Sequence, residues 1–263
     1  MSSGFRIQPI PNSRIATFDV FAVGLKKHHV SALLEIDVTD SREKLRKLRR
    51  SGQNISLNAW LIKCICATVE MHPEAAAFKV SKRKLMIFDD VNVSFMVEKE
   101  NQGRKIPLPL LVEKANHKSI SELTAEIESA KGENAEADTI VLNKSTLWYE
   151  QLYYKLPGFI RRSTWKLMLS IPRFTYRKMG NVVITSLGMI GSLNGWFIHR
   201  SVHPLSVGIG AVVKKPVVID KEVKIREILN MTVLIDHDVL DGAPMVRFVK
   251  DLTKIIEEGQ MLN

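Results

Sequence analysis

The segment from residue 180 to the C-terminus constrains the fold most, because three β-forming runs and one helical pattern follow one another there. The runs read GNVVITSLGMIG, LSVGIGAVVKKPVVID and ILNMTVLID, and a helix is predicted from about Ala243 to Glu258. Val, Ile and Thr favour strands, and turn chemistry separates the runs. The last strand ends in Asp236, His237 and Asp238, so ionisable residues are expected where it meets the helix.

The rest of the chain mixes helical and strand patterns. Strands are predicted in HHVSALLEIDVT and on both sides of the turn ENQGRK. Helices are predicted in SREKLRKLRRS, in LNAWLIKCICATVEMHPEA, which stops near Pro73, and in SISELTAEIESAKG, where a Ser cap is followed by Glu122. No internal repeat or low-complexity linker is visible, so residues 1–263 are interpreted as a single mixed α/β domain.

Composition limits the class of protein. With 45% apolar and 25% charged residues, 263 residues can bury a sizeable core. No apolar run reaches the roughly 18 residues that span a bilayer, and MSSGFRIQPIPNSR lacks the apolar stretch of a signal peptide. A cytoplasmic protein is therefore expected. Cys64 and Cys66 lie in an apolar helical pattern without a second pair, which predicts core residues and no metal site.

The formal net charge of +10 favours anionic partners. Nucleic acid, an acidic membrane surface, an acidic protein and a phosphorylated cofactor all fit this charge. No helix-turn-helix, zinc-finger or RNA-recognition motif is present, so a nucleic-acid partner is not expected.

The stretch DHDVLDGAPMVRFVKDL resembles the active-site signature of the catalytic domain of dihydrolipoamide acyltransferases and of chloramphenicol acetyltransferase. In that signature a His is followed four residues later by Asp-Gly and then a helix. The stretches EIDVT, LIKCICATVEMHPEAAA, VEKANHKSISELTAEI, GNVVITSLGMIG and AVVKKPVV also follow the family's order, so the resemblance covers about residues 13–260. It implies a chloramphenicol acetyltransferase-like two-layer fold with a mixed sheet flanked by helices. It further implies a homotrimer, or a larger shell, with active sites between subunits.

The resemblance assigns catalytic roles to His237, Thr185 and Asp241, and Ser186 is a candidate substrate-binding residue. His237 would be the general base, since an imidazole titrates near neutrality and can take and return a thiol proton. Thr185 occupies the place of a family Ser that binds the oxyanion from the neighbouring subunit, and Ser186 is the nearby substitute. The alternatives are a surface or structural role for His237 and a packing role for Thr185.

By the same resemblance, Asp241 acts in the catalytic set as a positioning group, and Arg14, Gly242 and His29 are given supporting roles. Asp241 would hold the active-site turn through a buried ion pair, with Arg14 as its partner. Gly242 would permit the backbone turn into the final helix. His29 matches a family His and is assigned either substrate contact or packing.

The implied activity is acyl transfer between CoA, or a lipoyl thiol, and an acceptor. Acyl-CoA would be the substrate, and no lipoyl segment is visible, so a lipoyl group would be supplied in trans by another chain. Two alternatives are a stand-alone acetyltransferase for a small-molecule or lipid acceptor and a non-catalytic trimeric scaffold. Asp238, where the family commonly has Arg, reverses the charge beside the histidine.

An insertion at about residues 147–180 departs from the family pattern. It holds all four Tyr residues, two of the four Trp residues, seven basic residues and one Glu. This mixture suits packing or oligomer contact, contact with a membrane surface or lipid substrate, and a cover over a cofactor or substrate. The sequence leaves these three roles open.

Overall fold

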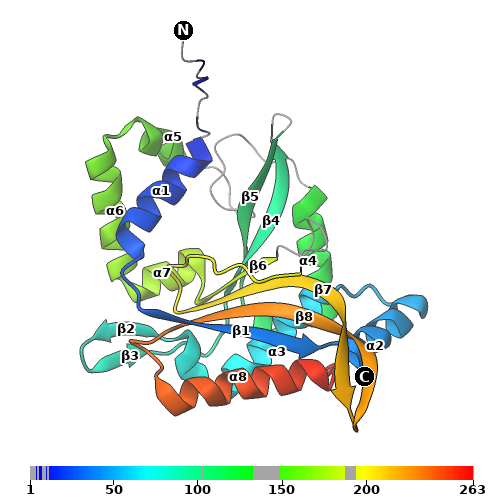
Figure 1. Cartoon of the computed structure of the whole chain (residues 1–263). Coiled ribbons are helices and arrows are strands. Elements are labelled where there is room, and N and C mark those ends of the chain that lie inside the picture. The colour runs from blue at the N-terminus through cyan, green and yellow to red at the C-terminus, as the bar shows by residue number, and fades with distance from the viewer. Residues whose placement is uncertain are drawn as a thin grey trace.

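The computed structural model describes residues 12–101, 104–132, 148–186 and 194–262, together with residues 4, 6, 7 and 10. Within them a six-stranded mixed sheet has the strand order β1-β8-β7-β6-β4-β5 (Figure 1). In that order the strands are β1 (His29–Asp37), β8 (Glu222–Asp236), β7 (Leu205–Ile219), β6 (Val182–Ser186), β4 (Val93–Asn101) and β5 (Arg104–Val112). Strand β6 runs parallel to β4 and β7, and the other neighbours are antiparallel.

Helices cover one face of this sheet, which gives the two-layer fold that the sequence predicts (Figure 1). They are α2 (Thr39–Arg50), α3 (Leu57–Met71), α4 (Ile120–Gly132) and α8 (Gly242–Glu257). A small hairpin of β2 (Phe78–Ser81) and β3 (Lys84–Met86) lies beside them. The capping box predicted at α4 is present, because Glu122 N donates to Ser119 Oγ (3.2 Å) and Ser119 N donates to Glu122 Oε2 (2.7 Å).

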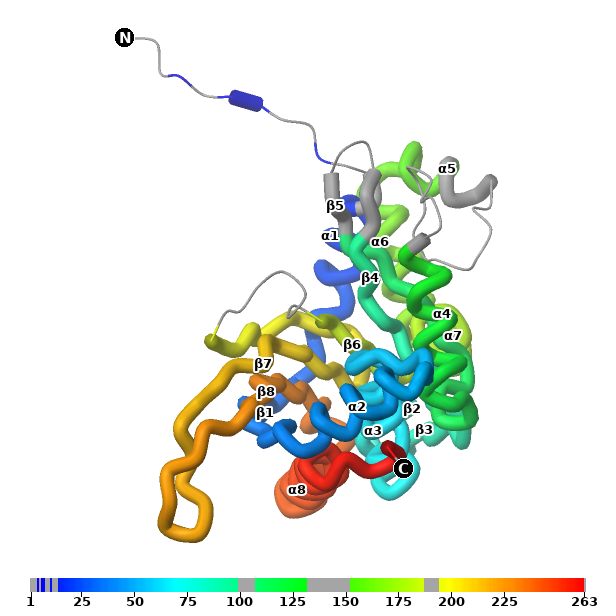
Figure 2. The backbone as a smooth tube through the Cα atoms, turned by 90° about the vertical axis from the view of Figure 1, so that its right-hand side faces the viewer, coloured from blue at the N-terminus to red at the C-terminus, as the bar shows by residue number. Residues whose placement is uncertain are grey.

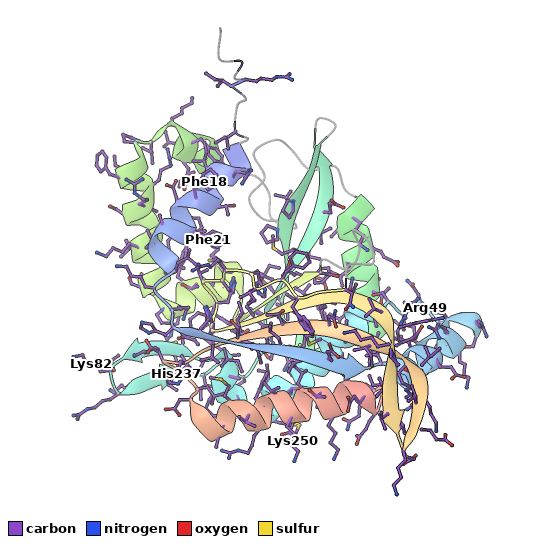
Figure 3. All side chains as sticks on the ribbon, viewed as in Figure 1. Phe18, Phe21, Arg49, Lys82, His237 and Lys250 are labelled. Atoms are coloured by element: carbon purple, nitrogen blue, oxygen red, sulfur yellow. The ribbon has the colours of Figure 1, made fainter. Side chains whose placement is uncertain are left out.

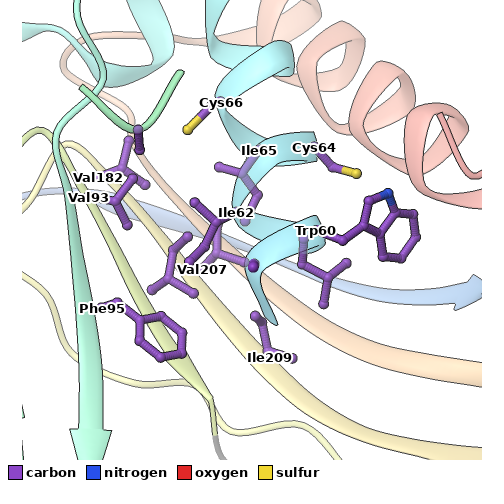
Figure 4. Close-up of a cluster of buried hydrophobic side chains, with 14 of the residues drawn as sticks. Trp60, Ile62, Cys64, Ile65, Cys66, Val93, Phe95, Val182, Val207 and Ile209 are labelled. Atoms are coloured by element: carbon purple, nitrogen blue, oxygen red, sulfur yellow. The ribbon is translucent and has the colours of Figure 1, made fainter. Parts of the chain in front are cut away.

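The hydrophobic core lies between α3 and the sheet (Figure 4). Trp60 and Ile62 of α3 are fully buried and belong to one cluster with Phe95 of β4. Cys64 and Cys66 are buried free thiols in the same helix, which confirms their prediction as core residues. Burial raises the pKa of the Cys66 thiol to about 12, so this thiol stays protonated.

A group of helices stands beside the sheet, made of α1 (Asn12–Gly24), α5 (Trp148–Lys155), α6 (Gly158–Ser170) and α7 (Pro172–Met179) (Figure 1). Buried Asp19 of α1 accepts hydrogen bonds from Arg161 Nε (2.6 Å) and Tyr153 OH (2.8 Å). Trp165 Nε1 donates to the same Tyr153 oxygen (2.9 Å). These aromatic residues of the insertion therefore pack within the protomer.

The β7–β8 hairpin projects from the body of the protein (Figure 2). It carries three apolar side chains that are 70% to 74% exposed, namely Val218, Val223 and Ile225.

Among the helices that the structure describes, none combines the length and the apolar character that a membrane-spanning helix requires.

Candidate active site at the end of strand β8

His237 emerges where β8 leaves the sheet, near the β2–β3 hairpin (Figure 3). Its backbone N–H donates to His28 O (2.9 Å), and the N–H groups of Val239 and Leu240 donate to Asp236 O (2.9 and 3.1 Å). The side chain of His237 is exposed and forms no hydrogen bond with the residues that the structure describes. The backbone is thus fixed while the imidazole remains exposed.

Asp236 supports this turn from inside the protein. Its side chain is 2% exposed and forms an ion pair with Lys27 Nζ, and its Oδ1 accepts a hydrogen bond from Asp238 N (3.2 Å). A carboxylate buried this deeply requires a charged partner. The sequence places Asp236 at the junction but does not identify Lys27, because only the antiparallel pairing of β1 with β8 brings the two together.

Asp238 has its own counter-charge. Lys79 Nζ of β2 lies 3.1 Å from one carboxylate oxygen, and His28 Nδ1 lies 3.3 Å from the other. The hydrogen bond from Lys79, followed by that from His28, lowers the pKa of this carboxyl group. The negative charge next to His237 in the sequence is therefore compensated by β2.

The expected buried ion pair between Asp241 and Arg14 is not present, so that prediction is wrong for a single protomer. Asp241 is exposed at the start of α8, and its side chain makes no capping hydrogen bond. The guanidinium of Arg14 lies 5.4 Å from the ring centroid of Phe18 on its own helix. The physical reason is that α1 packs against α6 rather than against the start of α8.

Gly242 has a left-handed backbone conformation at the start of α8. Its φ is +50°, a left-handed conformation that residues with a Cβ adopt at a cost. The chain turns there from the loop after His237 into α8.

Thr185 and Ser186 point to opposite faces of β6, as consecutive strand residues do. Ser186 Oγ donates to Asn58 Oδ1 of α3 (3.4 Å), so it faces the helical layer. Thr185 is half-buried on the other face, opposite Gly208 of β7. Thr185 is thus the hydroxyl directed away from the core, and Ser186 is engaged inside the protomer.

A single protomer does not bring Thr185 and His237 together. Thr185 pairs with Gly208, and Gly208 pairs with Thr232 of β8, five residues before His237. Thr185 and His237 are therefore separated by roughly 10 Å across the sheet and roughly 16 Å along the strand. A base and an oxyanion donor must both lie within roughly 3 Å of the reacting atoms, so these two cannot serve one site within one protomer.

Three histidines on the same side of the sheet as Thr185 were not identified as a group from the sequence. His29 Nε2 donates to His203 O (2.9 Å), and His203 Nε2 donates to Met179 O (3.0 Å). His199 Nε2 is hydrogen-bonded to Ser206 Oγ. Burial lowers the pKa of all three, and it lowers that of His203 to about 4. His29 thus contacts a carbonyl within the protomer, and its assignment to substrate contact or packing stays a prediction.

The low pKa of His203 predicts a pH-dependent stability. Above pH 6.5, the pKa of a histidine in the unfolded chain, His203 is neutral in both states and does not lower the free energy of unfolding. As the pH falls toward 4 the unfolded chain binds a proton that the folded chain does not. His203 alone should therefore reduce the free energy of unfolding by about 2 kcal/mol between pH 7 and pH 5. Urea titrations of the wild type and His203→Gln measure this, and equal losses in both proteins would contradict it.

A cavity of about 600 Å³ lies elsewhere, between α7 and the segments at residues 90–92 and 113–114. Neither His237 nor Thr185 lines it. Among the described residues there is no group of three His, Cys, Asp or Glu side chains arranged to hold a metal ion.

The sequence model of the 2-oxoacid dehydrogenase acyltransferase catalytic domain matches residues 5–141 and 176–263. The chain belongs to this family. The acyltransferase match leaves out residues 142–175, which lie largely within the insertion at about 147–180.

Known acyltransferases resemble the chain over most of its length. A dihydrolipoyllysine-residue acetyltransferase component of the pyruvate dehydrogenase complex from Rickettsia prowazekii is 25% identical over 225 residues, 85% of this chain and 46% of that protein. The chain therefore spans about half the length of this relative.

Solved structures also resemble the fold. The cubic core of the pyruvate dehydrogenase multienzyme complex has a TM-score of 0.69 at 18% identity, covering 99% of this chain and 95% of that one. A dihydrolipoamide acetyltransferase from Azotobacter vinelandii, described for the roles of a serine, a histidine and an asparagine in its catalytic mechanism, has the same score, identity and coverage. A chloramphenicol acetyltransferase has a TM-score of 0.51 at 11% identity, covering 98% of this chain and 99% of that one, so the expected fold class is confirmed.

Proposed function

We propose that this chain is an acyltransferase whose active site forms between two copies, with His237 from one protomer and Thr185 from its neighbour. The observation that carries the proposal is the separation of these two side chains within one protomer, while both face away from the core. A second copy can supply the missing partner.

The chemistry follows from the two side chains. His237 accepts the proton of an acceptor thiol, and the resulting thiolate attacks the carbonyl carbon of an acyl thioester. Thr185 Oγ1 donates a hydrogen bond to the oxygen that gains negative charge in the tetrahedral intermediate. When the intermediate collapses, the bond to the leaving sulfur breaks and His237 returns its proton to that sulfur. No covalent acyl-enzyme is needed.

The spacing of the residues supports these roles. In the Azotobacter acetyltransferase the named histidine lies 52 positions after the named serine and four positions before the named asparagine. His237 likewise lies 52 positions after Thr185 and four positions before Asp241. Ser186 does not fit this spacing and is hydrogen-bonded to α3, which favours Thr185 as the oxyanion donor.

Assembly into a homo-oligomer is part of the proposal. The exposed apolar side chains of the β7–β8 hairpin favour burial against another protein surface. The relative that forms the cubic core of a multienzyme complex supports self-association of this fold. We infer a homotrimer or a multiple of it, because a cyclic arrangement gives every His237 a neighbouring Thr185.

We further infer that the acyl donor is acyl-CoA, or an acyl-lipoyl group carried by another chain. The test is incubation of the protein with a panel of acyl-CoA thioesters and free dihydrolipoamide, followed by chromatographic measurement of CoA and of the acyl-dihydrolipoamide. We expect equimolar formation of both products. CoA released without acyl-dihydrolipoamide would mean hydrolysis and would contradict transfer to this thiol. Amine and alcohol acceptors in parallel reactions distinguish the stand-alone acetyltransferase alternative.

A further inference from the structure

The outer face of α6 carries exposed apolar and basic side chains that have no role in the proposed acyltransferase site. Six residues form one stripe along this helix and are all exposed, namely Phe159, Arg162, Ser163, Lys166, Leu167 and Ser170. Their spacing of three and four residues places them on the same side. No residue of α6 is buried, and Figure 1 shows the helix at the edge of the protein, outside α1.

The apolar side chains of this stripe are unusually exposed for their size. Phe159 is 65% exposed and Leu167 is 63% exposed, and Ile171, which follows the helix, is 46% exposed. The inner side of α6 is different, since Arg161 and Trp165 are held there by Asp19 and Tyr153. The helix is thus fixed on the protein by its inner side, while its outer side leaves apolar groups in water.

The charged side chains of α6 and of the segment that follows it are all basic. Residues 158–179 contain six basic residues and no acidic residue. Among the described residues no ion pair joins Arg162 or Lys166 to a carboxylate, and both lie between Phe159 and Leu167 on the stripe. This local charge therefore favours an anionic partner that also accepts apolar side chains.

From these observations we propose that the outer face of α6 binds an anionic lipid surface. Phe159 and Leu167 enter the boundary between headgroups and acyl chains, and Arg162 and Lys166 contact lipid phosphates. An acidic protein would neutralise the two cations, but it would also need an apolar groove for a convex helix. A bilayer accepts both kinds of side chain along one flat surface, which is why lipid is the favoured occupant.

Vesicle sedimentation of the chain of residues 1–263 tests this proposal. We expect the wild type to sediment at low salt with phosphatidylcholine vesicles that contain phosphatidylglycerol, and not with phosphatidylcholine alone. Arg162→Gln with Lys166→Gln should weaken binding about thirtyfold, because each surface cation contributes about fivefold. Phe159→Ser with Leu167→Ser should weaken it by about tenfold or more, because two apolar groups no longer enter the bilayer.

A matched control removes the same charge from another helix. Arg247 and Lys250 are exposed on α8, and Lys250 points away from the sheet (Figure 3). Arg247→Gln with Lys250→Gln should leave vesicle binding within about twofold of the wild type, since surface attraction falls off within a Debye length. Circular dichroism of each variant establishes that it is folded.

Three outcomes would overturn the proposal. The first is no binding of the wild type to anionic vesicles, and the second is equal weakening by the α6 and α8 variants. The third is binding that depends on the cations alone. In that case the Phe159→Ser, Leu167→Ser double variant would bind vesicles as the wild type does, and polyglutamate would compete with the vesicles. That result would identify the face as a surface for acidic polypeptides. None of these readouts depends on acyl transfer.

Discussion

His237→Ala is expected to lower kcat for thiol-to-thiol acyl transfer by about 10² to 10⁴, because general-base catalysis contributes a factor of this size. The turn that presents the imidazole is held by backbone hydrogen bonds and by the Asp236–Lys27 pair, none of which uses the His237 side chain. The variant should therefore keep its fold and its oligomeric state. Steady-state transfer from acyl-CoA to dihydrolipoamide measures the rate, and size-exclusion chromatography measures the assembly.

The matched control for this variant is His117→Ala. His117 is also an exposed histidine, but it contacts Asp90, at the end of the sheet where β4 begins. Its loss should leave kcat unchanged. Retention of wild-type transfer by His237→Ala would contradict the proposed base. Absence of transfer in the wild type as well would favour the non-catalytic scaffold.

Thr185→Ala should reduce kcat by about 10² to 10³, the usual cost of removing one oxyanion donor. Thr185→Ser should stay within about tenfold of the wild type, because it keeps the hydroxyl and loses only a methyl group. Thr185→Val preserves the shape without the hydroxyl and should behave like the alanine variant. A strand residue chosen for packing would give the opposite order, with valine nearest to the wild type.

Mixing the two inactive variants tests whether the site spans two protomers. In a randomly assembled oligomer of His237→Ala and Thr185→Ala chains, about a quarter of the interfaces combine an intact His237 with an intact Thr185 from the neighbour. Co-refolded mixtures should therefore recover about a quarter of the wild-type activity. A site contained in one protomer would give no recovery, since every chain lacks one of the two residues.

The sequence was sufficient for the elements whose patterns are local. Strands β6, β7 and β8, helix α8 and the capping box at Ser119 and Glu122 follow from β propensity, turn residues and cap chemistry that act over a few residues. The left-handed turn at Gly242 was predictable for the same reason, because few other residues adopt this conformation at low cost. The family and its two-layer fold also followed from motifs read in order along the chain.

Pairings between distant residues were not predictable in this way. The family resemblance implied that Asp241 pairs with Arg14, but the folded protomer places Arg14 over Phe18 and leaves Asp241 exposed. It did not identify Lys27 as the partner of Asp236 or Lys79 as the partner of Asp238. In each case the choice depends on which elements pack together, and no local pattern specifies that.

The insertion also shows which features the sequence could predict and which required the tertiary structure. Its composition indicated aromatic and basic character, and three roles remained open on that basis. Only the folded structure turns Tyr153 and Trp165 toward Asp19 while it leaves Phe159 and Leu167 in water beside Arg162. The sequence by itself thus determined which chemical groups the protein has and which local elements carry them. The tertiary structure decided which groups meet, because burial and sheet register act between residues that are far apart along the chain.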